Sequence, residues 1–341
     1  MADYKAIKGH TIQTVAGDPS NLAPGLIWYD SAAKKVQGAK TAAGTWASGG
    51  NLPGNFTGHS GFGSQTAGLV AGGEIAGSDN AEAFHYDGSS WTAGGNIITQ
   101  RGGGNQRGYG TQTAGALVGG HHPNIPTAVS ASHETYDGSS WSEAGDLNTG
   151  RGYQATASKG TTTAALCFGG FINPETAPNP FGAVGNKDES EEYNGTSWSE
   201  GDDLVGTGSQ YGGGAGTQTA ALAFGGDDGS SKLATTESYN GTSWTEVGDL
   251  NTGRARVMAG GTEDVAIAAG GTSGSYIGNT EQWDSTSWTE VADLSVARGT
   301  GASGVTASAT DGFVAGGQPS GGANDTEEWT YATAAVTFTS S

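Results

Sequence analysis

Short apolar runs recur along the chain, and each of them ends in a pair of glycines. The run from Ala220 to Phe224 is an example, and its length suits a strand better than a helix. A glycine pair at the end of a strand lets the backbone adopt positive φ or pack closely against a neighbour. The pattern therefore predicts an all-β protein with many tight turns, marked by Gly72-Gly73, Gly119-Gly120, Gly169-Gly170, Gly225-Gly226, Gly270-Gly271 and Gly316-Gly317.

A recurring tryptophan forms a second marker that advances in phase with the glycine pairs. It stands at Trp46, Trp91, Trp141, Trp198, Trp244 and Trp288. In all but the first repeat, an aromatic residue and a turn precede it, as in Tyr86-Asp-Gly-Ser-Ser-Trp91. The Asp-Gly and Asn-Gly dipeptides favour a two-residue hairpin turn. In one repeat we expect four strands, at 255–259, 265–269, 280–283 and 288–291, which is the content of one propeller blade.

These markers resemble the kelch repeat, in which an apolar strand ending in Gly-Gly is followed by a Tyr and then a Trp. Ala220 to Gly226, Tyr239 and Trp244 match that order and spacing. The resemblance implies a six-bladed kelch-like β-propeller with four-stranded antiparallel blades over residues 44–332. Glycines would let blades approach one another, and the aromatic residues would fill the wedge between twisted sheets. Because one propeller fold hosts many activities, the resemblance says little about function.

The two ends of the repeat region complement each other. Trp46 has no glycine pair before it, and Gly316-Gly317 has no tryptophan marker after it. We therefore expect residues 44–50 to supply the outer strand of a blade whose other strands come from about 300–331, which would pair the open edges. This leaves residues 1–43 as an N-terminal arm and 333–341 as a tail. Seven blades remain an alternative if 26–30, 35–39 and 335–339 form more than an arm and a tail.

Charge and cysteine content narrow the functional classes. The 14 basic and 34 acidic residues give a net charge of −20, which disfavours nucleic acid and anionic membranes as partners. The single cysteine, Cys167, excludes an intramolecular disulfide framework and reads as a buried apolar residue. We expect no membrane insertion, because there is no apolar stretch of spanning length, and synthesis in the cytoplasm, because no secretory signal is present.

A second resemblance concerns the arm. Pro24 to Asp30, then Val36 and Gly44 to Trp46, are similar to the short anchor that precedes repeat domains in bacteriophage tail-fibre and other virion proteins, particularly of marine phages. The residue pattern from Gly216 to Gly226 is similar to that of kelch-like proteins encoded in phage genomes. The resemblance implies a multicopy or homo-oligomeric virion protein: a tail fibre, appendage or capsid decoration. The arm would attach to other virion proteins, and the propeller would bind a host-surface glycan or protein.

The sequence offers no convergent set of catalytic groups, so we expect a non-enzymatic protein without cofactor or metal. The pair His121-His122 lacks further ligands at metal-binding spacing, and the acidic clusters lack the spacing of a calcium loop. Some kelch relatives oxidise sugars with copper, but Cys167 is not accompanied by the histidine motif of those enzymes. The alternative function is a carbohydrate-active enzyme or lectin, since two blades could each supply a carboxylate.

Binding residues are expected on the loops that depart most from the repeat. The third repeat carries an insertion from Phe171 to Gly182, and the second carries His121 to Pro126 at the same place. Both loops should emerge on one face from adjacent blades. The candidate binding residues are His121, His122, Asn124, Phe171, Asn173 and Phe181. The recurring Arg101, Arg151, Arg254 and Arg298 are expected to form structural ion pairs near the channel, or else to face an anionic ligand at its mouth.

Overall fold

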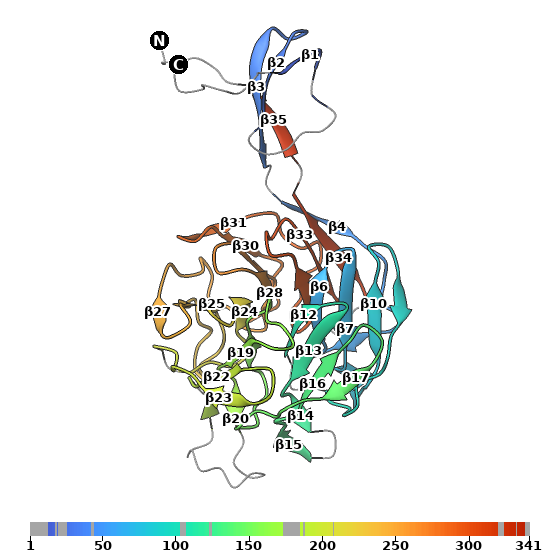
Figure 1. The fold of residues 1–341 in the computed structure, drawn as a ribbon, viewed down its shortest axis with the longest axis vertical. Coiled ribbons are helices and arrows are strands. Elements are labelled where there is room, and N and C mark those ends of the chain that lie inside the picture. Colours follow the sequence, from blue (N-terminus) through green and yellow to red (C-terminus); the bar gives the residue numbers. More distant parts are fainter. Residues whose placement is uncertain are drawn as a thin grey trace. The chain divides into compact units, whose positions relative to one another are not determined.

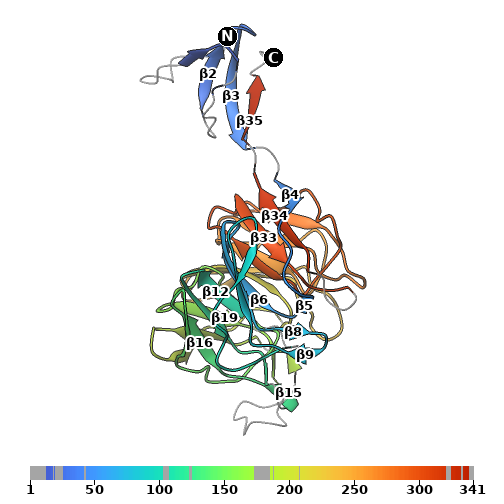
Figure 2. The same cartoon turned by 90° about the vertical axis from the view of Figure 1, so that its right-hand side faces the viewer.

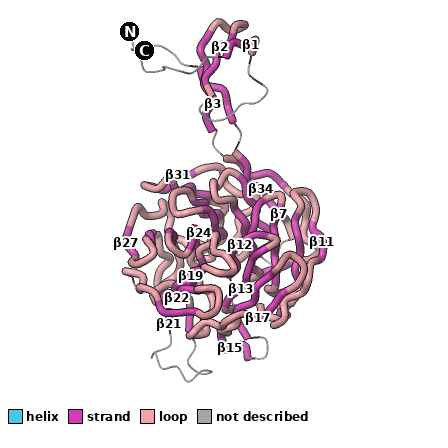
Figure 3. The backbone as a smooth tube through the Cα atoms, in the orientation of Figure 1, coloured by secondary structure: helices cyan, strands magenta, loops and turns pink. Residues whose placement is uncertain are grey.

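The protein is built from β-strands, as the sequence predicts. The computed structural model describes residues 13–17, 19, 26–41, 44–102, 107–122, 125–172, 185–186, 188–206, 208–319, 324–331 and 333–337. Over these residues the chain alternates between strands and loops and contains no helix (Figure 3). Its contacts divide it into two compact units, one of residues 45–330 and one of residues 1–44 with 331–341.

Within residues 45–330, the described strands form six four-stranded antiparallel sheets, each of which takes up one sequence repeat (Figure 1). Sheet 1 contains β6 (Ser60–Ser64), β7 (Ala67–Ala71), β10 (Ala83–Tyr86) and β11 (Trp91–Ala93). Sheet 2 contains β12 (Arg107–Thr111), β13 (Ala114–Val118), β16 (His133–Tyr136) and β17 (Trp141–Glu143). Sheet 3 contains β18 (Ala155–Thr156), β19 (Ala165–Phe168), β22 (Ser190–Tyr193) and β23 (Trp198–Glu200).

The remaining three sheets repeat the same order of strands. Sheet 4 contains β24 (Gly213–Thr217), β25 (Ala220–Phe224), β26 (Thr236–Tyr239) and β27 (Trp244–Glu246). Sheet 5 contains β28 (Met258–Gly261), β29 (Ala266–Ala269), β30 (Thr280–Trp283) and β31 (Trp288–Glu290). Sheet 6 contains β32 (Ala302–Val305), β33 (Asp311–Ala315), β34 (Thr326–Thr330) and, as its fourth strand, β4 (Thr45–Ser48).

Sheet 6 joins segments from the two ends of the repeat region. Strand β4 pairs antiparallel with β34, and Trp46 lies opposite Trp329. The predicted pairing of residues 44–50 with the C-terminal repeat is therefore confirmed. It gives sheet 6 the fourth strand that its own repeat lacks.

The first strands of the six sheets contact one another in sequence. Strand β6 contacts β12, and the contacts continue through β18, β24, β28 and β32 back to β6; Figure 2 shows β6 beside β12. A cavity of about 30 Å³ lies among these strands, and all six contribute to its lining. Small residues make this approach possible, because a Cβ on Gly214 would collide with the carbonyl oxygen of Thr156.

Pairs of aromatic rings pack between the sheets. In each sheet the tryptophan of the fourth strand contacts an aromatic ring of the third strand, with centroids 4.5 Å apart for Tyr86–Trp91 and 5.5 Å for Trp283–Trp288. The indole Nε1 of Trp288 also donates a hydrogen bond of 3.0 Å to Thr236 Oγ1 in sheet 4. These tryptophans therefore act as structural wedges between neighbouring sheets.

The backbone conformation at the Gly-Gly pairs explains why both positions of each pair are glycine. Both members of each pair take positive φ, for example 64° at Gly225 and 112° at Gly226. A Cβ at Gly225 would also lie 2.6 Å from the carbonyl oxygen of Arg254, in the segment that leads to the next sheet. Only glycine meets both conditions without strain.

Two local predictions differ from the structure. The first strand of the fifth repeat begins at Met258 and not at residue 255, because Arg256 adopts a left-handed φ of 61° that interrupts extended backbone. The Asp-Gly connections are longer than two residues: β10 ends at Tyr86 and β11 begins at Trp91. The Asp87 carboxylate accepts hydrogen bonds from the amides of Ser89 and Ser90, which favours this longer turn.

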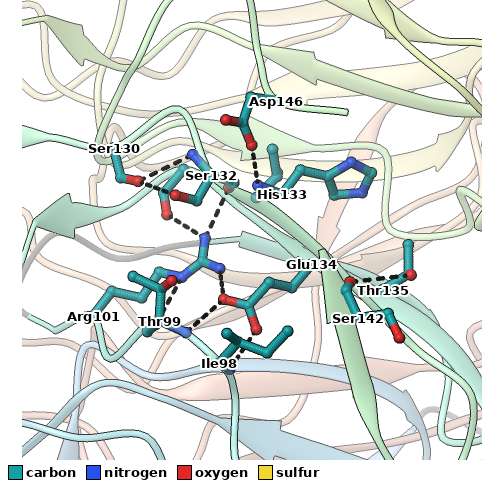
Figure 4. Close-up of polar contacts among 12 residues, drawn as sticks. Ile98, Thr99, Arg101, Ser130, Ser132, His133, Glu134, Thr135, Ser142 and Asp146 are labelled. Atoms are coloured by element: carbon teal, nitrogen blue, oxygen red, sulfur yellow. Dashed lines mark hydrogen bonds and ion pairs between the residues drawn. The ribbon is translucent and has the colours of Figure 1, made fainter. Parts of the chain in front are cut away.

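Four buried ion pairs connect successive sheets. Arg101 lies in the segment after sheet 1, and its guanidinium pairs with Glu134 on the third strand of sheet 2 (Figure 4). It also donates to the carbonyl oxygens of Gly119 and Ser132, at 3.1 and 2.8 Å. The amides of Ile98 and Thr99 donate to the same Glu134 carboxylate. The same arrangement recurs at Arg151–Glu191, Arg254–Glu281 and Arg298–Glu327. The predicted structural ion pairs are therefore present, but their glutamates lie on the third strands, and none of the paired residues lines the cavity among the first strands, near which they were expected.

The other unit contains one further four-stranded sheet. Its strands are β1 (Gln13–Val15), β2 (Ile27–Asp30), β3 (Lys35–Thr41) and β35 (Thr333–Thr337), in that order. Strands β2 and β3 pair antiparallel as a hairpin. Strand β35 pairs antiparallel with β3, so the predicted arm and the predicted tail share one sheet. The segments considered for a seventh blade thus belong to a separate compact unit.

Three small sheets complete the described structure of residues 45–330. They follow or flank the glycine pairs, where the repeats differ most in length. Their strands are β5 (Phe56–Thr57), β8 (Glu74–Ile75) and β9 (Ser78–Asp79); β14 (His121–His122) and β15 (Ile125–Val129); and β20 (Phe171–Ile172) and β21 (Gly185–Asn186).

Candidate functional site

Five residues with left-handed backbone form a chain at the start of the first strands. Each of them stands two residues before the first strand of its sheet. We call this group the left-handed arc; it consists of Gly58, Tyr153, Tyr211, Arg256 and Thr300, with φ between 59° and 62°. Four of the five are not glycine, and such conformations carry strain that is found most often at functional sites. The equivalent position before β12 lies outside the described residues.

Backbone hydrogen bonds hold the arc together. The amide of Tyr211 donates to the carbonyl oxygen of Tyr153 at 2.7 Å, and the amide of Arg256 donates to that of Tyr211 at 2.8 Å. Thr300 and Gly58 continue the series at 3.3 and 3.0 Å. The left-handed φ lets each peptide reach the one from the preceding sheet, so the geometry is imposed by the backbone and leaves the side chains free to differ.

The side chains at the centre of the arc form a stack. The rings of Tyr153 and Tyr211 have centroids 4.2 Å apart. The Arg256 guanidinium carbon lies 4.2 Å from the centroid of the Tyr211 ring, within the range of a cation–π contact. All three side chains are half-buried. The arc thus presents two aromatic rings and a fixed positive charge close together.

An acidic group lies beside this stack. Burial raises the pKa of the Tyr153 hydroxyl, and the neighbouring Tyr211 adds to this rise. Arg256 opposes it, and the negative charge of Glu74 makes the smallest contribution in the same direction as burial. The pKa of Glu74 is itself raised, first by burial and then by the charge of Asp79. A Cβ on Gly102 would collide with both acidic side chains, which shows that they flank the same backbone segment. The site therefore combines aromatic, cationic and acidic groups.

The loops predicted to bind adjoin the arc in part. Phe171 is half-buried in β20, and its backbone pairs with Gly152, the neighbour of Tyr153. His121 and His122 form β14, which follows the glycine pair of the adjacent sheet (Figure 1). The side chains of His121 and His122 are outside the described structure, as are Asn124, Asn173 and Phe181. Of the six predicted binding residues, the structure therefore describes Phe171 with its side chain and the two histidines by their backbone alone.

The sequence reasoning missed the arc itself. Its members share a backbone conformation but no residue type, so the repeat markers give no signal there. The only available sign was positional, since Tyr153, Tyr211 and Arg256 occupy corresponding places after the outer tryptophans.

A hollow lies at the end of the first strands opposite the arc. It has a volume of about 470 Å³ and is lined by turns such as those at Ser64, Thr111 and Thr161. Lys159 lies at its edge, and its Nζ donates to the carbonyl oxygen of Val305. Burial lowers the pKa of Lys159 to about 8, although the nearby Asp311 acts in the other direction. Glycine and threonine dominate this lining, and the aromatic rings are at the other end.

The described residues contain no group of three or more His, Cys, Asp or Glu side chains that could hold a metal ion. None of the described segments forms a helix that could cross a membrane. A scan of the sequence against family models finds no match, and a search of curated proteins finds none with significant similarity.

Proposed function

We propose that the chain is a non-enzymatic binding and display protein of a bacteriophage particle. In this proposal residues 45–330 form a six-bladed, kelch-like β-propeller that binds a host-surface glycan at the left-handed arc. The separate unit of residues 1–44 and 331–341 attaches the protein to other virion proteins.

Three features support the propeller. Six of the described sheets of residues 45–330 are four-stranded, and their first strands contact one another in a cyclic order. All six of these strands line the central cavity. The pairing of β4 with β34 joins the two ends of the repeat region within one sheet. Together these contacts have the connectivity of a ring of blades around one axis.

The observation that carries the binding proposal is the stack of Tyr153, Tyr211 and Arg256. Tyrosine rings offer an apolar face on which the C–H groups of a sugar ring can pack, and their hydroxyls hydrogen-bond to sugar hydroxyls. The guanidinium supplies a charged donor for a carboxylate or sulfate substituent. Strained backbone conformations, held by hydrogen bonds between sheets, fix these groups before the ligand arrives.

The assignment to a virion rests on the resemblance of the arm and repeat to phage proteins, and on charge. A net charge of −20 keeps a protein soluble when many copies are crowded on a particle. Quantitative detection of the chain in purified particles of the encoding phage tests this part. Its absence from gradient-purified particles would contradict the virion role and leave the glycan proposal intact.

The binding experiment compares wild type with Tyr211→Gly on a glycan array, followed by titration of the best ligand. Glycine suits the left-handed φ, so this variant removes the ring without adding strain. We expect the dissociation constant to rise by about tenfold or more, which corresponds to about 1.4 kcal/mol of lost contact.

Thr300→Gly provides the matched control, because it changes another member of the arc that carries no ring. Its affinity should stay within about twofold of wild type. Equal binding by wild type and Tyr211→Gly, or an equal loss in both variants, would contradict the proposed site.

A carbohydrate-active enzyme is the second candidate, and the acidic pair Glu74 and Asp79 favours it. A carboxyl group with a raised pKa beside another carboxylate is the usual arrangement of a glycosidase acid. Incubation of the bound glycan with the protein distinguishes the two functions. Turnover that Glu74→Gln abolishes would support the enzyme, whereas an unchanged glycan supports the binding protein.

A further inference from the structure

One buried pair of positions is occupied in three different ways among the six repeats. Four repeats carry the arginine and glutamate of the ion pairs described above. At the corresponding positions of sheet 1 stand Phe56 and Phe84, whose ring centroids lie 5.4 Å apart. Both charges are thus replaced together by an aromatic contact. In sheet 4 the glutamate is kept as Glu237, but Ser209 stands where the other repeats have arginine: its carbonyl oxygen accepts a hydrogen bond from the Gly170 amide, as that of Arg151 does from Gly120.

Glu237 is held like its counterparts but lacks their cation. Its side chain is buried, with 6% of the residue exposed. The amides of Val205 and Gly206 donate to its carboxylate at 2.7 and 3.1 Å, as those of Ile98 and Thr99 do to Glu134. Burial raises the pKa of Glu237, and the charges of Glu246 and Asp188 act in the same direction. No basic side chain pairs with it among the described residues.

A cavity of about 20 Å³, partly open to solvent, lies at this place. Glu237, Gly225 and Thr235 are among its lining residues. Gly225 and Thr235 correspond to Gly119 and Ser132, whose carbonyl oxygens accept hydrogen bonds from Arg101. The cavity therefore combines a carboxylate with the two backbone positions that bind a guanidinium in the other repeats. Phe168 and Phe224 supply apolar walls.

We propose that this cavity, the Glu237 pocket, binds a guanidinium group that comes from another molecule. The carboxylate forms the charged contact, and the carbonyl oxygens of Gly225 and Thr235 accept the remaining N–H groups. A guanidinium fits this acceptor set better than an ammonium ion, since it is planar and presents several donors in fixed directions. The source is either a small guanidinium compound or the arginine side chain of a peptide.

The test is calorimetric titration of the full chain with methylguanidinium, with urea as the neutral analogue of similar shape. Millimolar concentrations avoid denaturation. We expect saturable binding of methylguanidinium and none of urea. Glu237→Gln should weaken binding by at least tenfold. The matched control is Glu246→Gln, which changes the exposed glutamate opposite Glu237 in the sheet and should bind as wild type does.

Ser209→Arg provides an independent test, because Ser209 lines the cavity and the variant supplies the missing side chain from within the chain. This variant should lose methylguanidinium binding and melt at a higher temperature than wild type. Titration with a tripeptide that has a central arginine identifies the source: tighter binding than methylguanidinium indicates a peptide, and equal or weaker binding indicates a small molecule. Absence of binding to wild type, or equal binding by Glu237→Gln, would overturn the proposal.

Discussion

Two sets of residues recur from one repeat to the next. The first, which we call the framework, consists of the four Arg–Glu ion pairs and the contacts between each outer tryptophan and an aromatic ring; the second is the left-handed arc. The two sets differ in what is repeated. In the framework the residue types recur: arginine meets glutamate in four places, and tryptophan contacts an aromatic ring in every sheet. In the arc the backbone recurs while the side chains change from glycine to tyrosine, arginine and threonine. Packing between sheets therefore constrains the residue types, whereas the arc constrains only φ and ψ and leaves its side chains free to differ in chemistry.

The largest expected effect comes from breaking one ion pair of the framework. Arg151→Ala leaves Glu191 buried without its cation, and we expect the free energy of unfolding to fall by about 3–5 kcal/mol. Denaturant titration measures this loss. The double variant Arg151→Phe with Glu191→Phe imitates Phe56 and Phe84 and should recover most of the stability. A loss below 1 kcal/mol in the single variant would show that the pair does not stabilise the framework.

A slightly smaller effect concerns the buried His133, which packs among framework residues. Burial lowers its pKa to about 4, and the charge of Arg101 contributes. Because an unfolded histidine has a pKa near 6.5, the unfolded chain binds the proton first. The stabilisation from neutral His133 is therefore complete above pH 6.5 and is lost as the pH falls toward 4, by about 3 kcal/mol.

Unfolding experiments on wild type and His133→Gln between pH 7 and pH 4 check this expectation. The advantage of wild type over the variant should shrink steadily across that interval. A difference that stays constant with pH would mean that His133 does not become protonated on unfolding.

The smallest expected effect is in the arc. Arg256→Ala keeps the left-handed strain, whereas Arg256→Gly relieves it, so the glycine variant should be more stable by about 1 kcal/mol. Thermal and denaturant unfolding of both variants measure the difference. Both should lose binding to an acidic glycan, since neither retains the guanidinium. Equal stability of the two variants would show that the backbone at residue 256 is not strained.

The fold was largely predictable because its determinants are local and repeated. The glycine pairs mark strand ends that require positive φ, and the unpaired markers at Trp46 and Gly316-Gly317 predict the pairing of β4 with β34. The pairing of β35 with β3 was not predictable, since neither segment carries a repeat marker. The predicted start of β28, at residue 255, was wrong because nothing in the sequence reveals the left-handed φ of Arg256.

The candidate site was predictable only in its neighbourhood. The position of Phe171 is predictable because its loop departs from the repeat, and its backbone pairs with Gly152, the neighbour of Tyr153. Tyr153 and Tyr211 are not predictable as a site, since their contact joins residues that precede two different sheets and depends on φ values that residue types do not encode. Glu237 was missed for a different reason: its significance lies in the arginine that is absent from its repeat.

The most direct test of the account is a density map of the protein with a bound oligosaccharide. The map distinguishes two binding sites, one at each end of the first strands. One is the arc, with Tyr153, Tyr211 and Arg256, and the other is the hollow beside Lys159. We predict sugar density packed on the tyrosine rings, within hydrogen-bonding distance of the Arg256 guanidinium, on a ring of six sheets. Density confined to the hollow beside Lys159, or sheets that do not close around one axis, would contradict the account.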